Sequence, residues 1–340
     1  MEFKNINKQT TPILPKVVAT LVVTSILLAV GLVLSPNISK TLFETEDCPN
    51  STNLKISELK KLALEVEHDG KTECSIQLWK EVVKKRPADG KAAVNLAMRL
   101  TEAEHYKEAL PYYEHSIKLG VGAYDAFAWY ARTLKYIGKR PEAIIWYYRA
   151  LSVNPKLSDI TAELSELLVL EDRPYEALSL LGSYDKVIAK RDYFKARRIS
   201  ILTQITPKDK EVKSFTVAKS RNDHYFVYVG FSENKGLPFL IDTGASTLTL
   251  DEKLLNEMDI KYKIVKSDLK FKVADGRLIT GKKIELSTFQ VGPYNLNNVT
   301  AITCSECSSL VGQNILNQFD LTTKRKEGVE FLTMTPRDQQ

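Results

Sequence analysis

Hydrophobic positions follow three different patterns along the 340-residue chain. An 18-residue run without any charge occupies residues 17–34. Apolar residues then recur at helical spacings of three and four over residues 56–206, and short β-rich runs separated by Gly, Asn and Asp fill residues 207–340. The pattern therefore predicts a multidomain chain with an N-terminal transmembrane helix, an all-α domain and an all-β domain.

The charge-free run, Val17–Leu34, is long enough to cross a bilayer, because a helix of this length spans about 27 Å. Lysines precede it and carboxylates follow it, so the positive-inside rule places residues 1–16 in the cytoplasm and the 35–55 linker, with all that follows, outside. A cleaved signal peptide is the alternative, with Ala29-Val30-Gly31 as a weak cleavage site. Both interpretations export the rest of the chain, to the periplasm if the source is bacterial. The flanking charges are Lys4, Lys8 and Lys16 before the run and Glu44, Glu46 and Asp47 after it.

A period of 34 residues runs through the helical part. It resembles the tetratricopeptide repeat (TPR), in which small residues let the two helices of a hairpin approach closely. The resemblance divides residues 56–206 into units at 56–89, 90–123, 124–157 and 158–191, with a capping helix over Lys190–Thr206. Such solenoids bind peptides or partner proteins. The recurring residues are Leu62, Leu96, Tyr130 and Leu164; Ala63, Ala97 and Ala131; Ala109, Ala143 and Ala177; and Trp79, Tyr113 and Tyr147.

Helical periodicity stops at Pro207, and short runs rich in Val, Ile, Phe and Thr indicate an all-β barrel. Two short helices are expected within it, at Asp251–Glu257 and Gln313–Asn317. The predicted strands are Phe215–Ala218, Tyr225–Phe231, Leu237–Ile241, Leu269–Val273, Lys282–Val291 and Val299–Thr303.

The candidate chemistry of the barrel lies where an apolar strand runs directly into Asp242-Thr243-Gly244-Ala245. Asp is a poor strand residue, and a carboxylate that closes a buried strand needs a reason. An ordinary turn is the simpler interpretation. The context is more specific, because Leu310-Val311-Gly312 and a short helix follow about 70 residues later, and Ala274-Asp275-Gly276-Arg277 forms a predicted hairpin tip in between.

This combination resembles the retropepsin-like aspartic proteases, the single-domain, retroviral-type branch, over residues 213–335, and more closely their bacterial membrane-anchored members. The resemblance implies that Asp242 is catalytic and that Thr243, Gly244 and Ala245 support its loop. It also implies that Leu310, Val311 and Gly312 pass under that loop. Ala274, Asp275, Gly276 and Arg277 would then belong to the flap that covers a peptide substrate.

Aspartic proteases use two carboxylates that share one proton. The sequence contains one Asp-Thr-Gly triplet, and Asp320 is not followed by Thr-Gly. We therefore expect a symmetric homodimer in which each chain supplies Asp242. The family further implies that Thr243 hydrogen-bonds across the dimer axis.

The four cysteines form two pairs in the sequence. Cys304-Ser305-Glu306-Cys307 ends shortly before Gly312, and its exported location favours a disulfide, although free thiols, a redox couple or metal binding are alternatives. Cys48 and Cys74 form a second possible bridge, which would close a loop of about 26 residues and stabilise the fold by ~3 kcal/mol.

Composition narrows the function classes further. The formal charge of +6 is spread evenly, since residues 1–35, 36–205 and 206–340 each carry +2. Nucleic-acid binding needs concentrated cations and is therefore disfavoured. Four cysteines and four histidines are too few for a zinc scaffold, so we expect neither a metal nor a cofactor.

The expected function is thus a membrane-anchored, homodimeric aspartic endopeptidase that cleaves protein or peptide substrates recruited by the repeats. Two alternatives stay open. One is a non-catalytic scaffold in which the barrel dimerises and the repeats bind partner proteins; the other is a protease whose repeats block its cleft. An intact Asp-Thr-Gly favours the enzyme, because a scaffold has no need of a carboxylate at a dimer axis, where like charges repel.

Overall fold

The computed structural model describes residues 48–182, 191–206, 209, 213–220, 223–232, 235–272, 276, 278–305 and 307–337. The predicted membrane segment, 17–34, and the cytoplasmic residues before it lie outside these ranges. Among the helices that are described, none combines the length and the apolar content that a membrane span requires. The repeats and the strands both belong to one compact unit, Asn53–Gln340.

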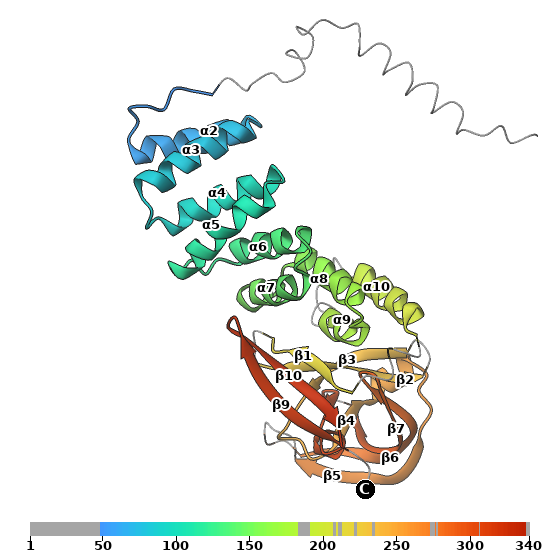
Figure 1. The fold of residues 1–340 in the computed structure, drawn as a ribbon. Helices are drawn as coiled ribbons and strands as arrows, with labels where there is room; N and C mark the ends of the chain where they lie inside the picture. Colours follow the sequence, from blue (N-terminus) through green and yellow to red (C-terminus); the bar gives the residue numbers. More distant parts are fainter. Residues whose placement is uncertain are drawn as a thin grey trace, which may run out of the picture. The chain divides into compact units, whose positions relative to one another are not determined.

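The helical region is a series of antiparallel hairpins whose helices follow one another in chain order (Figure 1). The first helices of the four units begin at Ile56, Gly90, Tyr124 and Ser158, which are 34 residues apart. The helix starts therefore recur with the same 34-residue period as the sequence pattern. The helices are α2 (Ile56–His68), α3 (Thr72–Lys85), α4 (Gly90–Glu102), α5 (Tyr106–Lys118), α6 (Tyr124–Tyr136), α7 (Arg140–Val153), α8 (Ser158–Leu170), α9 (Pro174–Leu181) and α10 (Arg191–Gln204).

Small residues at the predicted positions account for the close packing of each hairpin. Ala63, Ala97 and Ala131 are all 0% exposed, as are the alanines of the second helices. The turn between the two helices of every unit contains one residue with positive φ, a glycine in the first and third units and an acidic residue in the second and fourth. Those residues are Gly70, Glu104, Gly138 and Asp172. Only glycine adopts this conformation without strain, so packing overrides the local preference in two of the units.

The strands form a barrel and a smaller sheet. In the larger sheet the order is β2-β3-β8-β4-β7-β6-β5, and a second pairing between β2 and β6 closes the first six strands into the barrel. The smaller sheet has the order β1-β10-β9. The elements are β1 (Phe215–Ala218), β2 (Tyr225–Ser232), β3 (Lys235–Ile241), β4 (Leu248–Asp251), α11 (Glu252–Glu257), β5 (Lys263–Lys272), β6 (Leu278–Val291), β7 (Tyr294–Cys304), β8 (Leu310–Val311), α12 (Gln313–Leu316), β9 (Phe319–Lys326) and β10 (Val329–Pro336).

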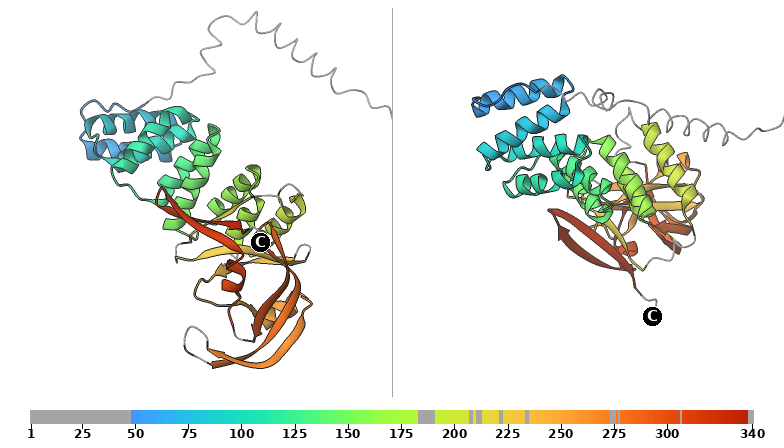
Figure 2. Two further views of the ribbon diagram at one scale, coloured as in Figure 1. Left: turned by 60° about the horizontal axis from the view of Figure 1, so that its bottom comes forward. Right: turned by 45° about the horizontal axis from the view of Figure 1, so that its top comes forward.

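The β9–β10 hairpin was not among the strands predicted from the sequence. Its first strand is mostly polar and exposed, so it lacks the alternation that reveals a half-buried strand. Only Val329, Leu332 and Met334 of β10 turn inward. The hairpin lies beside α7 (Figure 2), where Arg149 donates to the Gly328 carbonyl at 3.4 Å and the Tyr148 and Phe331 rings meet edge to face.

Helix α9 joins the repeats to the barrel, which explains why no separate unit begins at residue 207. It packs against β1, β2 and β3. The Tyr228 amide donates to Ser179 Oγ at 2.9 Å, and Gln290 Nε2 donates to Tyr175 Oη at 3.0 Å. A Cβ at Gly182 would lie 2.1 Å from the Pro238 ring, so the chain passes too close to β3 for any side chain there. The barrel thus packs directly on the last helix of the repeats, while α10 contacts α9 as the first helix of a further unit would.

A buried carboxylate lies at the same junction. Glu176 is 3% exposed; it accepts a hydrogen bond from Tyr148 Oη at 2.9 Å and one from Arg173 Nε at 2.8 Å. Burial raises the pKa of Glu176 above its ordinary value, although Arg173 and Tyr148 favour the charged form. All three groups belong to the repeats, so their hydrogen bonds tie α7 to α9 and to the turn before it.

We expect Glu176→Ala to destabilise the protein by about 3 kcal/mol, because it leaves the Tyr148 hydroxyl and the Arg173 guanidinium without their partner in a buried site. Denaturant unfolding measures the change. The matched control is Glu166→Ala on the exposed face of α8, which should change stability little. Equal effects of the two substitutions would contradict this account.

Because the raised pKa favours the protonated folded state, wild type should lose stability relative to Glu176→Gln as the pH rises through that pKa.

Candidate active site

Asp242 follows directly after the last residue of β3. Its backbone N–H donates to the Val311 carbonyl at 3.0 Å, which extends the pairing of β3 with β8 by one bond. The Gly244 amide donates to Asp242 Oδ1 at 2.9 Å. The carboxylate is therefore oriented by its own loop and stays partly exposed at the end of a strand whose last residue, Ile241, is buried.

Leu310, Val311 and Gly312 pass under this loop, as the resemblance implied. The short strand β8 lies between β3, to which it is parallel, and β4, to which it is antiparallel. A Cβ at Gly312 would lie 2.6 Å from the Thr247 carbonyl oxygen and 2.8 Å from that of Ala245. The close approach of these two backbones, rather than an unusual φ, is what requires glycine here.

The side chains of Gln313 and Asn314, which directly follow Gly312, complete the support of the loop. Neither residue was among the site residues predicted from the sequence. Asn314 Oδ1 accepts from the Leu248 amide at 2.6 Å, while its Nδ2 donates to the Thr300 carbonyl at 2.8 Å. Gln313 Nε2 donates to the Thr243 carbonyl at 2.8 Å. The two amide side chains thus tie the far end of the catalytic loop to α12 and β7. Their position directly after Leu310-Val311-Gly312 was the only feature of the sequence that could have indicated this supporting role.

The outer edge of the loop is open. Thr243, Gly244 and Ser246 are exposed, and the Thr243 hydroxyl makes no hydrogen bond to any described residue. Asp320, the other aspartate considered from the sequence, lies on β9 and pairs with Arg337 at 2.8 Å. Within the described part of the chain, Asp242 thus has no carboxylate partner of its own.

The predicted flap corresponds to the β5–β6 hairpin, which is longer than the sequence indicated. The two strands pair as far as Lys272 and Leu278. Of the tip residues, Gly276 is exposed with φ of +88°, a conformation that favours glycine; Ala274, Asp275 and Arg277 lie outside the described residues.

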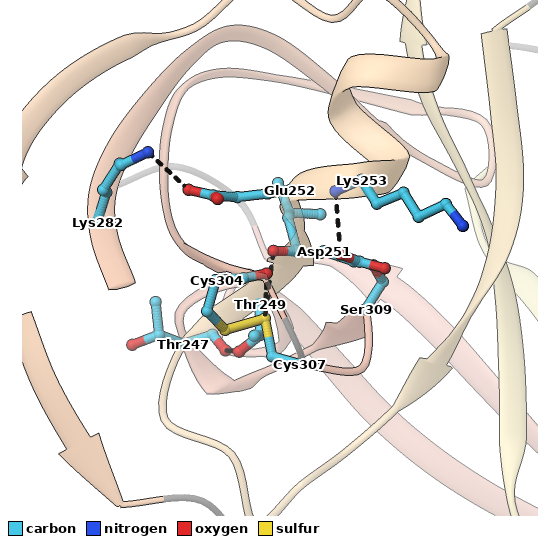
Figure 3. Close-up of a disulfide and its surroundings, with 10 residues drawn as sticks. Thr247, Thr249, Asp251, Glu252, Lys253, Lys282, Cys304, Cys307 and Ser309 are labelled. Carbon is cyan, nitrogen blue, oxygen red and sulfur yellow. Dashed lines mark hydrogen bonds and ion pairs between the residues drawn. A yellow bond between two sulfur atoms is a disulfide. The ribbon is translucent and has the colours of Figure 1, made fainter. Parts of the chain in front are cut away.

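Cys304 and Cys307 are joined by a disulfide at the end of β7 (Figure 3). Cys304 pairs with Asp251 of β4, whose amide donates to Ser309 Oγ at 3.0 Å. The turn that leads into Leu310 is therefore attached at both ends. Beside it, Lys282 of β6 forms an ion pair with Glu252 of α11 at 2.8 Å (Figure 3). Cys48 and Cys74, the second pair expected from the sequence, are disulfide-bonded as well.

Comparison with known proteins gives separate matches for the barrel and for the helical region. Residues 230–318 match the family model described as "gag-polyprotein putative aspartyl protease", a range that contains Asp242 and Leu310–Gly312. A search of curated proteins finds no significant match.

Solved structures are similar to separate parts of the chain. A retropepsin-like aspartic protease from Rickettsia conorii is 20% identical, covering 36% of this chain and 92% of its own, with a TM-score of 0.28. The MamA protein is 13% identical (44% and 81% covered, TM-score 0.41), and YrrB, a TPR protein with an unusual peptide-binding site, is 16% identical (45% and 78% covered, TM-score 0.40). Scores this low carry no argument, so the assignment stands on the repeat, the loop geometry and the family model. Together these show a TPR-like helical region followed by a barrel domain, within which residues 230–318 match an aspartyl protease family model.

Proposed function

We propose that this protein is a membrane-anchored aspartic endopeptidase that acts as a homodimer. The observation that carries the proposal is the position of Asp242, a partly exposed carboxylate on a loop held from below by β8, α12 and two amide side chains. A turn with no chemical role would not need this support.

The chemistry requires a second carboxylate close to the first. Two such groups share one proton, because their like charges oppose the ionisation of both. The ionised aspartate accepts a proton from water while the water oxygen attacks the scissile carbonyl carbon. The protonated aspartate donates a hydrogen bond to the carbonyl oxygen, and the C–N bond breaks after a proton reaches the nitrogen.

A second copy of the chain is the simplest source of that carboxylate. A two-fold axis through the catalytic loop would bring the two Asp242 side chains together. The exposed Thr243 and Gly244, with an unused Thr243 hydroxyl, supply the surface that such a contact would cover. A predicted anchor at Val17–Leu34 would favour the dimer by confining both copies to the membrane.

The repeats would recruit the substrate. Their second and third units present an aromatic pair, in which the exposed Tyr136 stacks on the half-buried Tyr106 with ring centroids 4.8 Å apart. Lys135 lies over the Tyr136 ring, and Arg132 lies over the Trp129 ring. Aromatic faces next to cations suit an extended peptide. Because α9 is packed against the barrel, a peptide held there would be presented to the barrel in a constant orientation.

Asp242→Asn should lower proteolysis by at least about 10³-fold, because an amide cannot take part in the shared proton. The unfolding midpoint should stay unchanged, because the Asn oxygen can still accept the hydrogen bond from the Gly244 amide. Digestion of a peptide library by purified full-length protein measures this. Asp320→Asn, the same change at the exposed ion pair of β9, is the control and should retain activity. Cleavage by the Asp242→Asn protein at the wild-type rate would rule out the mechanism.

Excess Asp242→Asn chains should inhibit wild type, because each mixed dimer holds one carboxylate instead of two. Specific activity should also rise with protein concentration until dimers predominate. Activity is followed as the inactive chain is added, with Asp320→Asn chains as the matched control that should not inhibit. If a protein shown by sedimentation to be monomeric is fully active, the second carboxylate comes from the same chain and the homodimer is wrong.

Residues 36–340 should lie outside the cytoplasm, because the lysines before Val17–Leu34 hold the N-terminus inside. A reporter that is active only after export, fused after residue 340, should be active in a bacterial host. Protease added to spheroplasts should digest the repeats while a cytoplasmic marker survives. Protection of the C-terminus under these conditions would reverse the orientation.

A further inference from the structure

A cavity lies at the junction of the repeats and the strands, where α7 and α9 run beside β10 and β1 (Figure 1). Its volume is 70 Å³, whereas a single water needs only about 10–15 Å³. No residue of the loop at Asp242 lines it. We call it the junction cavity. Its walls are mostly apolar, and they include Leu151, Pro155, Leu180, Val217 and Phe226.

A polar cleft of 390 Å³ adjoins the junction cavity. The cavity and the cleft share three lining residues, which are Ser152, Lys219 and Ser220. The rest of the cleft is lined by α7, by Asp223 and by the β9–β10 hairpin. A molecule that occupied both spaces would therefore need an apolar part and a polar part.

The charges that line the cleft do not balance. Arg149, Lys219 and Arg325 are the cations, and Asp223 and Glu330 are the anions. Lys219 is shared by both carboxylates, because its Nζ lies 3.1 Å from Glu330 and 3.5 Å from Asp223. The two arginines form no ion pair with any described residue.

The contacts of Arg149 hold its side chain at the cleft without neutralising it. Its Nη1 donates to the Gly328 carbonyl at 3.4 Å, and its guanidinium lies over the Phe127 ring at 5.4 Å from the centroid. Arg325 is exposed on β9, opposite Glu330 in the strand register. A guanidinium group binds a planar anion through two parallel hydrogen bonds, so this pair suits a carboxylate.

The Ser220 hydroxyl lies where the cavity meets the cleft. Its Oγ is buried and has no hydrogen-bond partner in the described part of the chain. The backbone of the same residue is satisfied, since its amide donates to the His224 carbonyl at 2.8 Å. Buried hydroxyls in native proteins are normally paired with protein, water or a ligand, so this group needs a partner from outside the chain.

We propose that the junction cavity and the cleft together bind a carboxylate that carries a short apolar group. The apolar group fills the cavity, the carboxylate accepts hydrogen bonds from Arg149 and Arg325, and the Ser220 hydroxyl donates to it at the boundary. Two kinds of molecule share this chemistry: a peptide that ends in an apolar residue, and a free short-chain acid. The inference does not depend on Asp242 and holds whether or not the chain is a protease.

Glu176 also lines the junction cavity, but its charge does not oppose such a ligand. Its Oε1 accepts from Tyr148 Oη at 2.9 Å, and its Oε2 accepts from Arg173 Nε at 2.8 Å. Burial raises the pKa of Glu176, and Arg173 compensates the carboxylate when it is ionised. The group is therefore neutral or paired.

A gap left by imperfect packing is the simpler explanation of the cavity. It accounts for the apolar walls, but it does not account for two uncompensated guanidinium groups or for an unpartnered hydroxyl at the boundary. The two explanations differ in what they admit. A packing gap takes up an apolar molecule whatever its charge, whereas the proposed site needs the carboxylate.

The test compares isocaproate with isocaproamide, which has the same apolar group, by titration calorimetry of full-length protein in neutral detergent. Wild type should bind the acid about 10-fold more tightly than the amide at low salt, and the ratio should fall as salt rises. Arg149→Gln/Arg325→Gln should bring the ratio close to one. The matched control, Lys324→Gln/Lys326→Gln, removes two charges from the same hairpin outside the cleft lining and should keep the wild-type ratio.

Ser220→Ala distinguishes a ligand contact from a structural one. It should weaken binding of isocaproate about 5-fold. The unfolding midpoint of the unliganded protein should not fall, because the hydroxyl has no partner to lose. Ala218→Leu and, separately, Ser152→Leu place a larger side chain at the cavity and should abolish binding of acid and amide alike.

Peptides separate the two sources of the ligand. Tighter binding of acetyl-Ala-Ala-Leu than of isocaproate, lost in its C-terminal amide, would assign the site to peptide C-termini; binding of isocaproate alone would assign it to a free acid. Equal affinity of wild type for isocaproate and isocaproamide would reduce the site to a packing gap. The inference is also overturned if neither binds at millimolar concentration, if the preference persists in Arg149→Gln/Arg325→Gln, or if binding survives both leucine substitutions.

Discussion

The passage of one chain segment beneath another is the constraint on which the candidate site depends. The backbone of Asp242 is bonded to Val311, and Gly312 lies so close to the Ala245 and Thr247 carbonyls that no side chain fits between them. Because these contacts join residues about 70 positions apart, the loop can form only after the barrel strands have paired. Precise placement of the Asp242 carboxylate is thus a property of the whole barrel, and the proposed mechanism requires such precision.

Contacts between distant parts of the chain also determine how the repeats end. A solenoid needs a final surface to cover its last apolar face. Here α10 and the barrel both pack on α9, and the chain at Gly182 lies against the Pro238 ring of β3. The repeats and the barrel consequently belong to a single unit, so the helices and the loop at Asp242 are held in a constant geometry.

The open edge of the loop concerns the proposed assembly. Thr243 and Gly244 are exposed, and they form the surface that the proposed second copy would cover. The disulfide between Cys304 and Cys307 lies in the connection to β8 and secures the segment that supports the loop.

The sequence by itself determined the period of the repeat, the start of the barrel, the loop at Asp242 and its supporting run, because each of these is a local pattern of small, apolar or turn-forming residues. It did not predict the β9–β10 hairpin, whose exposed strand has no alternation, or the amide supports at Gln313 and Asn314, whose partners are distant in the chain. Nor could it show that α9 packs on the barrel. Those features arise from strand register and from contacts across 49 to 115 residues, which only the tertiary structure decides.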